Sequence, residues 1–465
     1  MGIEKFTARS AEIDDTHQPP SIDVEKQQAL RTYLRKIDIF LLLWLWLLNI
    51  FCQFDKQAIG SAKVVGLEKE LGLKGRDFNI AATLFSVGFL LFDPVSPYVV
   101  SRWGASKALP CIVLLFGVVC GVTSLAHTKR DLYLLRFFLG VAESGFAPAV
   151  LFLLSSYYPR EKLTARVGWY YSASPAGGLV GGVMSSGISH IKHASISPWR
   201  WIYIVLGCIT LTLGLLSFFV INDKPESCSF LSPSDKELIK EANSHAPPEP
   251  VKAKEVARVL RDWQVWVFGI TCMLTSCGCS SINVFAPSII NNYGFTPSQS
   301  QALLAVPSIF GFFAMVGAGY LVRCLKSHYL ATVGTMSMVV VGCIILLSTL
   351  SVPARMVGLC LMAAGSFANF TILPGHFISN YSHTRAQANV SSAFVPMIGG
   401  LSVFVASNAY TNNQQPRYLI GHAINLTAAL LSIITSSILR YSMARRNKRN
   451  LLRHGEGGDY FKYIY

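Results

Sequence analysis

The sequence predicts an all-α membrane protein with twelve transmembrane helices in two halves of six. Apolar residues make up 52% of the 465 residues and charged residues only 14%. Windows of about twenty apolar residues, the length that spans a bilayer, recur along the chain. A polar interval after the sixth window divides the set in two. The mean hydropathy of +0.43 agrees with a chain that lies largely in lipid.

The windows set the expected order of the spans. The first six lie near residues 38–58, 79–100, 108–126, 132–154, 168–189 and 200–221, and the second six near 264–287, 301–322, 330–350, 356–378, 388–409 and 418–439. The expected parts are an N-terminal tail (1–36), a first half (37–222), a central loop (223–263), a second half (264–440) and a C-terminal tail (441–465). Charge and proline in the central loop predict a surface segment with a short helix from Asp235 to Glu241.

The net charge of +15 does not indicate a nucleic-acid partner, because lysine and arginine gather at span ends in alternate loops. The positive-inside rule predicts that these loops and both termini are cytoplasmic. The polar first 36 residues are not expected to form a cleavable signal, so the first span would insert the chain. Most of the eleven cysteines lie in apolar windows, where cysteine usually behaves as a small apolar residue. We expect no disulfide framework, no metal site and no cofactor.

Arg136 and Glu143 stand inside the fourth window, in RFFLGVAESG. A charge at the bilayer centre costs at least about 2.5–3.5 kcal/mol, so such residues are expected to face a partner or a water-filled cavity and to carry function. Their separation of seven residues places them on one helical face, roughly 10 Å apart along the axis. This pair predicts a transporter with one site for an anion and another for a proton.

Three further charged residues occupy the first two windows. Asp55 and Lys56 lie near the outer end of the first span, and we expect Asp55 to pair with Arg136, because both residues would lie in the outer half of the membrane. For Lys56 we expect a role in gating, with a neutralised ion pair at the interface as the alternative. Asp93 precedes Pro94, where a kink is expected, and is assigned to the inner gate.

Polar and small residues in other windows supply weaker candidates. Asn283, Asn369 and Asn389 are predicted to line a cavity from the second half, with interhelical hydrogen bonds as the alternative. The small-residue stretch from Ser172 to Gly187 predicts a surface where helices approach closely. The sequence contains no nucleotide-binding loop of the G-x-x-x-x-G-K-[ST] type, which would power a pump.

The chain resembles the anion:cation symporter family of the major facilitator superfamily, in particular its fungal allantoate permease-like branch, which includes carriers of nicotinate, pantothenate and biotin. The resemblance runs from about Arg35 to Tyr441. It rests on DKQAIGSAKVVGLEKELGL, RFFLGVAESGFAPAV, SSYYPREK, WRWIYIVLG, FAPSIINNYGF and NNQQPRYLIG in this order.

The resemblance implies two six-helix halves that rock about a central cavity. It also implies that Arg136 engages a substrate carboxylate, that Glu143 takes part in proton coupling and that Asp55 is a second protonation site. The family usually has arginine at the position of Lys56, so bidentate carboxylate recognition is lost there. The loop after the second span keeps Arg102 and Lys107, assigned to gating, but lacks the acidic residue of the superfamily's gating motif.

These observations predict a transporter, not an enzyme, that carries a small organic anion into the cell together with protons. We expect a monomer in the plasma membrane whose partners are the anion, protons and the bilayer. An exporter or an organellar carrier of an organic anion, such as a fungal secondary metabolite, is the alternative, because a fold does not set the direction of transport.

Overall fold

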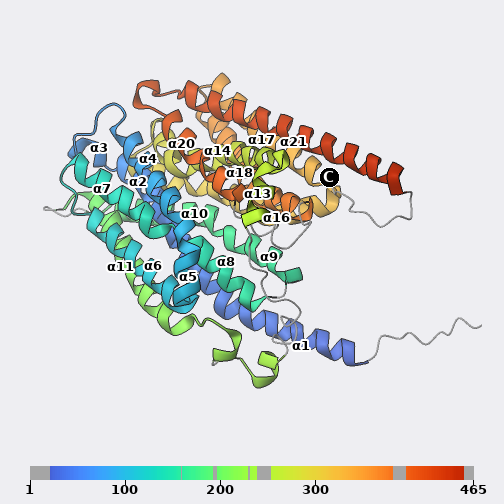
Figure 1. The fold of residues 1–465 in the computed structure, drawn as a ribbon. Coiled ribbons are helices and arrows are strands. Elements are labelled where there is room, and N and C mark those ends of the chain that lie inside the picture. The colour runs from blue at the N-terminus through green and yellow to red at the C-terminus, as the bar shows by residue number, and fades with distance from the viewer. Residues whose placement is uncertain are drawn as a thin grey trace, which may run out of the picture.

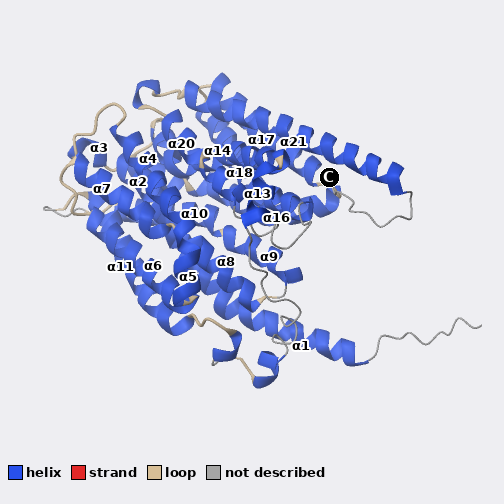
Figure 2. Cartoon of the chain, viewed as in Figure 1, coloured by secondary structure: helices blue, strands red, loops and turns tan. Residues whose placement is uncertain are grey.

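A computed structural model describes residues 21–158, 160–191, 196–228, 231–237, 253–380 and 394–454. Within these ranges every regular element is a helix (Figure 2). The first half of the chain forms α1 (Ser21–Ile37), η1 (Asp38–Leu42), α2 (Leu43–Val64), α3 (Leu67–Glu70), α4 (Asp77–Phe92), η2 (Asp93–Val95), α5 (Ser96–Trp103), α6 (Ala105–Thr123), α7 (Lys129–Glu143), α8 (Phe146–Tyr157), α9 (Arg160–Tyr171), α10 (Ala173–Ile188) and α11 (Pro198–Val220).

The second half follows a connecting segment that contains η3 (Pro225–Ser227). It forms α13 (Ala253–Arg261), α14 (Trp263–Asn291), α15 (Pro297–Leu303), α16 (Ala305–Leu325), α17 (His328–Ser348), α18 (Val352–Asn380), α20 (Ser402–Ala409), η4 (Asn412–Gln414) and α21 (Leu419–His454). The predicted surface helix begins at residue 233, where the Ser232 hydroxyl accepts a hydrogen bond from the Asp235 amide at 3.3 Å. Its predicted continuation to Glu241 lies outside the described residues.

Nine helical segments of the described chain are long and apolar enough to cross a membrane. The second, fifth and eleventh predicted spans are instead assembled from shorter pieces. The second breaks at η2, where Pro94 cannot continue the α-helical ladder, as the sequence predicted. The fifth is divided at Ser172 between α9 and α10, and the eleventh is described only from residue 394, with a break at Leu401 before α20.

The helices run roughly along one direction, with the loops gathered at two ends (Figure 1). One end, which we call the α3 end, contains α3 and the loops 124–128, 292–296 and 410–418. The other, the terminal end, contains α1, α13 and the last turns of α21. The two halves meet along α2, α10, α14 and α16.

Small residues set the closest helix contacts, as the sequence predicted for Ser172–Gly187. A Cβ on Gly182 of α10 would lie 2.6 Å from the carbonyl oxygen of Gln301 in the other half. A Cβ on Gly140 of α7 would lie 2.0 Å from the carbonyl oxygen of Phe85 in α4. A side chain at either position would force the helices apart. The Gly140 contact therefore fixes α7, and with it Arg136 and Glu143, against the second span.

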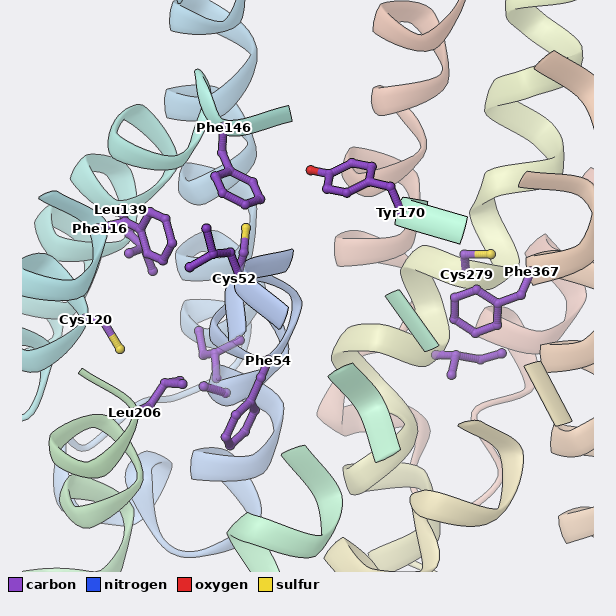
Figure 3. Close-up of a cluster of buried hydrophobic side chains, with 14 of the residues drawn as sticks. Cys52, Phe54, Phe116, Cys120, Leu139, Phe146, Tyr170, Leu206, Cys279 and Phe367 are labelled. Carbon is purple, nitrogen blue, oxygen red and sulfur yellow. The ribbon is translucent and has the colours of Figure 1, made fainter. Parts of the chain in front are cut away.

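The apolar core of the first half surrounds the inner face of α2. Figure 3 shows Cys52 and Cys120 among Phe116 and Leu206, while Cys279 and Phe367 lie apart from them in the second half. All six side chains are buried. Cys52 of α2 and Cys120 of α6 lie in the part of the core next to the charged residues described below.

Candidate functional site

A small cavity lies between the two halves, in the part of the helices toward the α3 end. Its volume is about 80 Å³, well below the roughly 300–1,000 Å³ of a pocket that encloses a drug-sized ligand. Helices from five predicted spans contribute to its wall, namely α2, α4 and α7 from the first half and α14 and α20 from the second. The lining residues are Lys56, Ile59, Ala82, Phe85, Arg136, Ser280, Asn283, Val284 and Val403. Two cations and no carboxylate belong to this lining.

Arg136 is a buried cation in the cavity wall, with only 1% of its surface exposed. Its Nη2 donates a hydrogen bond to the hydroxyl of Tyr203 in α11, and the guanidinium lies 5.6 Å from the centre of the tyrosine ring. The Nε has no hydrogen-bond partner in the described structure. Because a buried guanidinium with an unused donor is costly, the site favours an anion that would accept from it.

Glu143 and Lys56 form an ion pair beside the arginine. Lys56 Nζ lies 3.4 Å from Glu143 Oε2, and the Glu143 side chain has no exposed surface. The Cys52 thiol donates to the same carboxylate oxygen at 3.4 Å, whereas Oε1 has no partner among the described residues. Lys56 also lies 5.1 Å from the ring centre of Phe89. Lys56 thus contacts both the cavity and the buried carboxylate.

The position of Glu143 follows from a break in the fourth span. Glu143 is the last residue of α7, and α8 begins three residues later at Phe146. Pro148 has no amide hydrogen to donate to the carbonyl of Ser144, four residues before it, so the chain interrupts its helical ladder there. The Glu143 carboxylate therefore lies at the interruption between α7 and α8.

Asp55 is fully buried behind the cavity, with 0% exposure. The sequence predicted an ion pair between Asp55 and Arg136, and this prediction was wrong for the described conformation. Apart from the neighbouring Cys120 thiol, neither carboxyl oxygen of Asp55 has a hydrogen-bond donor there. Asp55 remains within electrostatic range of Arg136 and Glu143. The cation that forms an ion pair in this cluster is Lys56, and its partner is Glu143.

These four residues make a charge-balanced cluster. If all are ionised, Asp55 and Glu143 cancel Arg136 and Lys56. An added carboxylate would leave the cluster with one excess negative charge, and one added proton would restore neutrality. Because an uncompensated charge in the membrane interior is costly, binding of the anion and binding of the proton should favour one another.

Hydrogen bonds join the two halves at the α3 end. The Asn79 amide donates to the carbonyls of Ser407 and Tyr410, the second at 2.8 Å. The Ser61 hydroxyl donates to Gln301 Oε1 at 2.9 Å, and Gln301 Nε2 donates back to the Ser61 carbonyl at the same distance. All these side chains are buried, so this end of the interface is closed.

The predicted asparagines occupy different surroundings. Asn283 lines the cavity opposite Arg136. Asn369 does not belong to the lining, and its Nδ2 donates instead to Thr335 Oγ1 at 2.5 Å and to the Gly365 carbonyl at 3.1 Å. These contacts favour the interhelical hydrogen bond that the sequence left as the alternative. Asn389 lies outside the described residues.

Three of the four residues assigned to gating lie toward the terminal end of the first half. Asp93 begins η2 and is half-buried, at the break between α4 and α5. Arg102 is exposed and donates to the hydroxyl of Tyr98 at 3.1 Å, and Lys107 is exposed. Lys56, also assigned to gating, lies instead in the cavity wall.

An acidic residue missing from the loop at 101–109 is supplied by Asp223, three residues after the end of α11. The Asp223 carboxylate accepts from the Ser106 amide at 2.7 Å and from the Ser106 hydroxyl at 2.6 Å. Gly104, with a φ of +79°, lies against the same carboxylate and makes room for it. An acid at this place satisfies the free Ser106 amide at the start of α6 and interacts favourably with the helix dipole. Asp223 therefore ties the third span to the sixth.

Several site residues escaped prediction because nothing in their own segments identifies them. Tyr203 lies in an apolar span, and Cys52 and Cys120 were taken as small apolar residues. Their contacts with charged groups arise only when α2, α6, α7 and α11 pack together. WRWIYIVLG offered one signal: Trp199 and Arg200 bind Glu70 of α3 at 2.6 and 2.9 Å and place Tyr203 one turn further along α11.

Glu70 itself lies outside the spans. Burial alone would raise its pKa, but hydrogen bonds from Ser197, Trp199 and Arg200 lower the pKa below its ordinary value. The carboxylate therefore stays charged at neutral pH and clamps α3 to the start of α11. This contact joins two of the sequence motifs on which the family resemblance rests.

Comparison with known proteins gives the fold and the family. Residues 45–407 match the Major Facilitator Superfamily. The chain is 28% identical over 441 residues to the MFS-type transporter cnsO of Penicillium expansum, covering 90% of this chain and 84% of that protein. It is 27% identical over 461 residues to the high-affinity nicotinic acid transporter of Saccharomyces cerevisiae, covering 97% and 84%.

Two further comparisons also match this chain with membrane transporters. A putative tartrate transporter of Agrobacterium vitis is 28% identical over 285 residues, which cover 61% of this chain and 63% of that protein. The crystal structure of a bacterial homologue of the human lysosomal transporter Spinster, inward-facing and unoccupied, matches with a TM-score of 0.62 at 14% identity, over 86% of this chain and 94% of that one. This last likeness concerns the fold alone.

The all-helical fold and the charged cavity between two helical halves define a multi-pass membrane transporter. The chain belongs to the Major Facilitator Superfamily. The fold class predicted from the sequence is thereby confirmed.

Proposed function

We propose that this protein is a proton-coupled symporter that brings a small organic anion into the cell across the plasma membrane. In this proposal the protein acts as a monomer, has both termini in the cytoplasm and belongs to the allantoate permease-like branch. The single observation that carries the proposal is a cavity lined by two cations, Lys56 and Arg136, with the buried carboxyl groups of Glu143 and Asp55 behind them. The names of two relatives, a high-affinity nicotinic acid transporter and a putative tartrate transporter, support an organic acid as the substrate.

Binding of the anion begins at the free donor of Arg136. The guanidinium is already oriented by Tyr203, so its Nε and the cavity-facing edge are available for a carboxylate. Asn283 and Ser280 lie on the opposite wall and would contact the remainder of the substrate. Since the described cavity is smaller than an organic anion needs, binding requires the halves to separate on one side.

Lys56 connects the anion to the proton. While Glu143 is ionised, its carboxylate holds Lys56 at 3.4 Å and competes with the substrate for this cation. When Glu143 takes a proton, the ion pair is lost and Lys56 can face the anion together with Arg136. When Glu143 releases the proton, the ion pair with Lys56 forms again and anion binding weakens. Transport of the anion is thereby coupled to transport of the proton.

The closed α3 end suggests which step the described conformation represents. Asn79, Ser61 and Gln301 seal the interface on that side. With the termini in the cytoplasm, as proposed, this side faces outward. Import would then require these hydrogen bonds to break so that substrate can enter, and to re-form before release to the cytoplasm.

The proposal is tested by uptake of radiolabelled small carboxylates into cells that express the protein, at external pH 5 and pH 7.5. We expect one or more compounds to accumulate faster at pH 5, and Arg136→Ala to abolish this uptake at equal surface expression. Arg136→Lys keeps the charge and should restore only part of it, because the planar fork is lost.

A different outcome would favour the alternative direction of transport. If no carboxylate enters but preloaded cells lose one faster than cells without the protein, the protein is an exporter and the import proposal fails. Uptake that is equal at the two pH values and unchanged in Arg136→Ala would contradict both the coupling and the assigned anion site.

A further inference from the structure

The last helix is longer than a membrane crossing requires. α21 contains 36 residues, so it is about 54 Å long, whereas the hydrocarbon core of a bilayer is about 30 Å thick. In Figure 1 the red end of α21 extends at the terminal end past the neighbouring helices of the second half. Its final turns therefore have a role other than spanning the core.

These turns are strongly basic. Between Arg440 and Leu452 the sequence contains five lysine and arginine residues and no acidic residue. Arg445, Lys448 and Arg449 are exposed and, being three and four residues apart, share one face of the helix. Tyr441 and Leu452, 68% and 79% exposed, lie on the same side.

A second basic helix packs against the buried side of α21. Val259 of α13 is buried in the same apolar cluster as Leu439 and Met443 of α21. Arg258 and Arg261 of α13 are exposed. The Gln264 amide, just after α13, donates to the Ser442 hydroxyl at 3.0 Å and fixes the start of α14 against α21. The two helices are thus held in contact with the body of the second half.

We name these exposed cations the basic platform, defined by Arg258, Arg261, Arg445, Lys448 and Arg449. We propose that the basic platform binds the headgroups of anionic phospholipids in the leaflet at the terminal end. Its charge is complementary to such a surface, and clusters of four to eight cations next to a transmembrane helix have this affinity. The exposed tyrosine and leucine of α21 supply the apolar contact that an interfacial helix needs.

An accumulation of positive charge at one membrane face would arise in any protein that follows the positive-inside rule. The basic platform differs from such a general excess of charge because α21 is a continuous helix that presents its cations beside exposed apolar side chains. The proposal therefore predicts a localised effect of lipid charge on residues 440–454, independent of what the cavity transports.

The test is hydrogen–deuterium exchange of the full-length protein in nanodiscs of phosphatidylcholine, with or without about 30% phosphatidylserine. We expect peptides from residues 440–454 to exchange at least about threefold more slowly with phosphatidylserine, and the effect to weaken at about 0.5 M salt. Arg445→Gln, Lys448→Gln and Arg449→Gln together should remove the difference.

A matched control changes three exposed cations at the opposite end. Lys69→Gln, Lys74→Gln and Arg76→Gln together leave the basic platform intact, so the slowing at residues 440–454 should persist. Equal exchange in the two lipid compositions for the unmodified protein would overturn the proposal. So would equal slowing in phosphatidylcholine nanodiscs to which only soluble glycerophosphoserine is added, since a free headgroup would then suffice.

Discussion

Removal of the Lys56 ammonium should expose the energetic cost of the buried carboxylate of Glu143. Lys56→Met keeps the apolar stem and deletes the charge that lies 3.4 Å from Glu143 Oε2. Loss of one partner from a fully buried pair costs about 3–5 kcal/mol. The Lys56 side chain is 27% exposed, and solvent reduces the effect, so we expect a loss of roughly 2–3 kcal/mol.

The assay is thermal unfolding of the purified protein, followed by tryptophan fluorescence. For a chain of 465 residues, each kcal/mol shifts the unfolding midpoint by about 1 °C, so the midpoint should fall by about 2–3 °C at pH 7.5. The loss should shrink at pH 5, because a proton on Glu143 removes the unpaired charge. The double variant Lys56→Met, Glu143→Gln should recover most of the stability, since neither partner is then charged.

Lys129→Met is the matched control, because Lys129 forms its ion pair with Asp77 while 53% of its side chain is exposed. Its effect should stay below about 1 kcal/mol. The reasoning is refuted if Lys56→Met unfolds at the same temperature as the unmodified protein, or if the double variant is less stable than Lys56→Met alone.

Three other predictions concern helix packing, a helix cap and the closed end of the interface. Gly140→Val should lower the yield of folded protein sharply, because its Cβ would meet the Phe85 carbonyl oxygen, and size-exclusion chromatography would detect the loss. Asp223→Ala should lower stability by about 0.5–2 kcal/mol in thermal unfolding, because Ser106 loses its carboxylate partner. Asn79→Ala should raise the rate at which an impermeant thiol reagent reaches Val403→Cys from the α3 end by about fivefold, since hydrogen bonds between the halves are lost. An unchanged yield, midpoint or labelling rate would contradict the respective prediction.

Much of the architecture could be predicted because membrane insertion leaves few options for the backbone. The spacing of apolar windows gives the spans, and the proline after Asp93 gives the break in the second one. The rarity of charge in the spans singled out Arg136 and Lys56, which the structure places in the cavity wall. Asn283 was predicted to line the cavity in the same way, because side-chain amides are also rare in the spans.

Side-chain partners were harder to predict, since they depend on how each helix rotates about its axis. Asp55 and Lys56 are adjacent, so they point in directions about 100° apart. In a helix with apolar residues on most faces, the sequence pattern does not say which of them faces α7. Asp55 was therefore paired with Arg136, whereas the fold brings Lys56 of α2 to Glu143 at the end of α7.

Long-range contacts posed the same difficulty. Asp223 lies 117 residues after Ser106, whose amide it caps. Tyr203 lies 67 residues after Arg136. Neither polar residue has a sequence pattern that names its partner, so these contacts become visible only in the folded chain.

The measurement that tests the central claim most directly is proton movement in proteoliposomes. The purified protein is reconstituted with a pH-sensitive dye inside, and a transported carboxylate is added outside. The proposed mechanism predicts acidification of the interior that follows anion entry, with Glu143→Gln unable to concentrate the anion in response to a pH gradient and Arg136→Ala inactive in both respects. Anion entry without proton movement, or pH-driven accumulation that persists in Glu143→Gln, would contradict it.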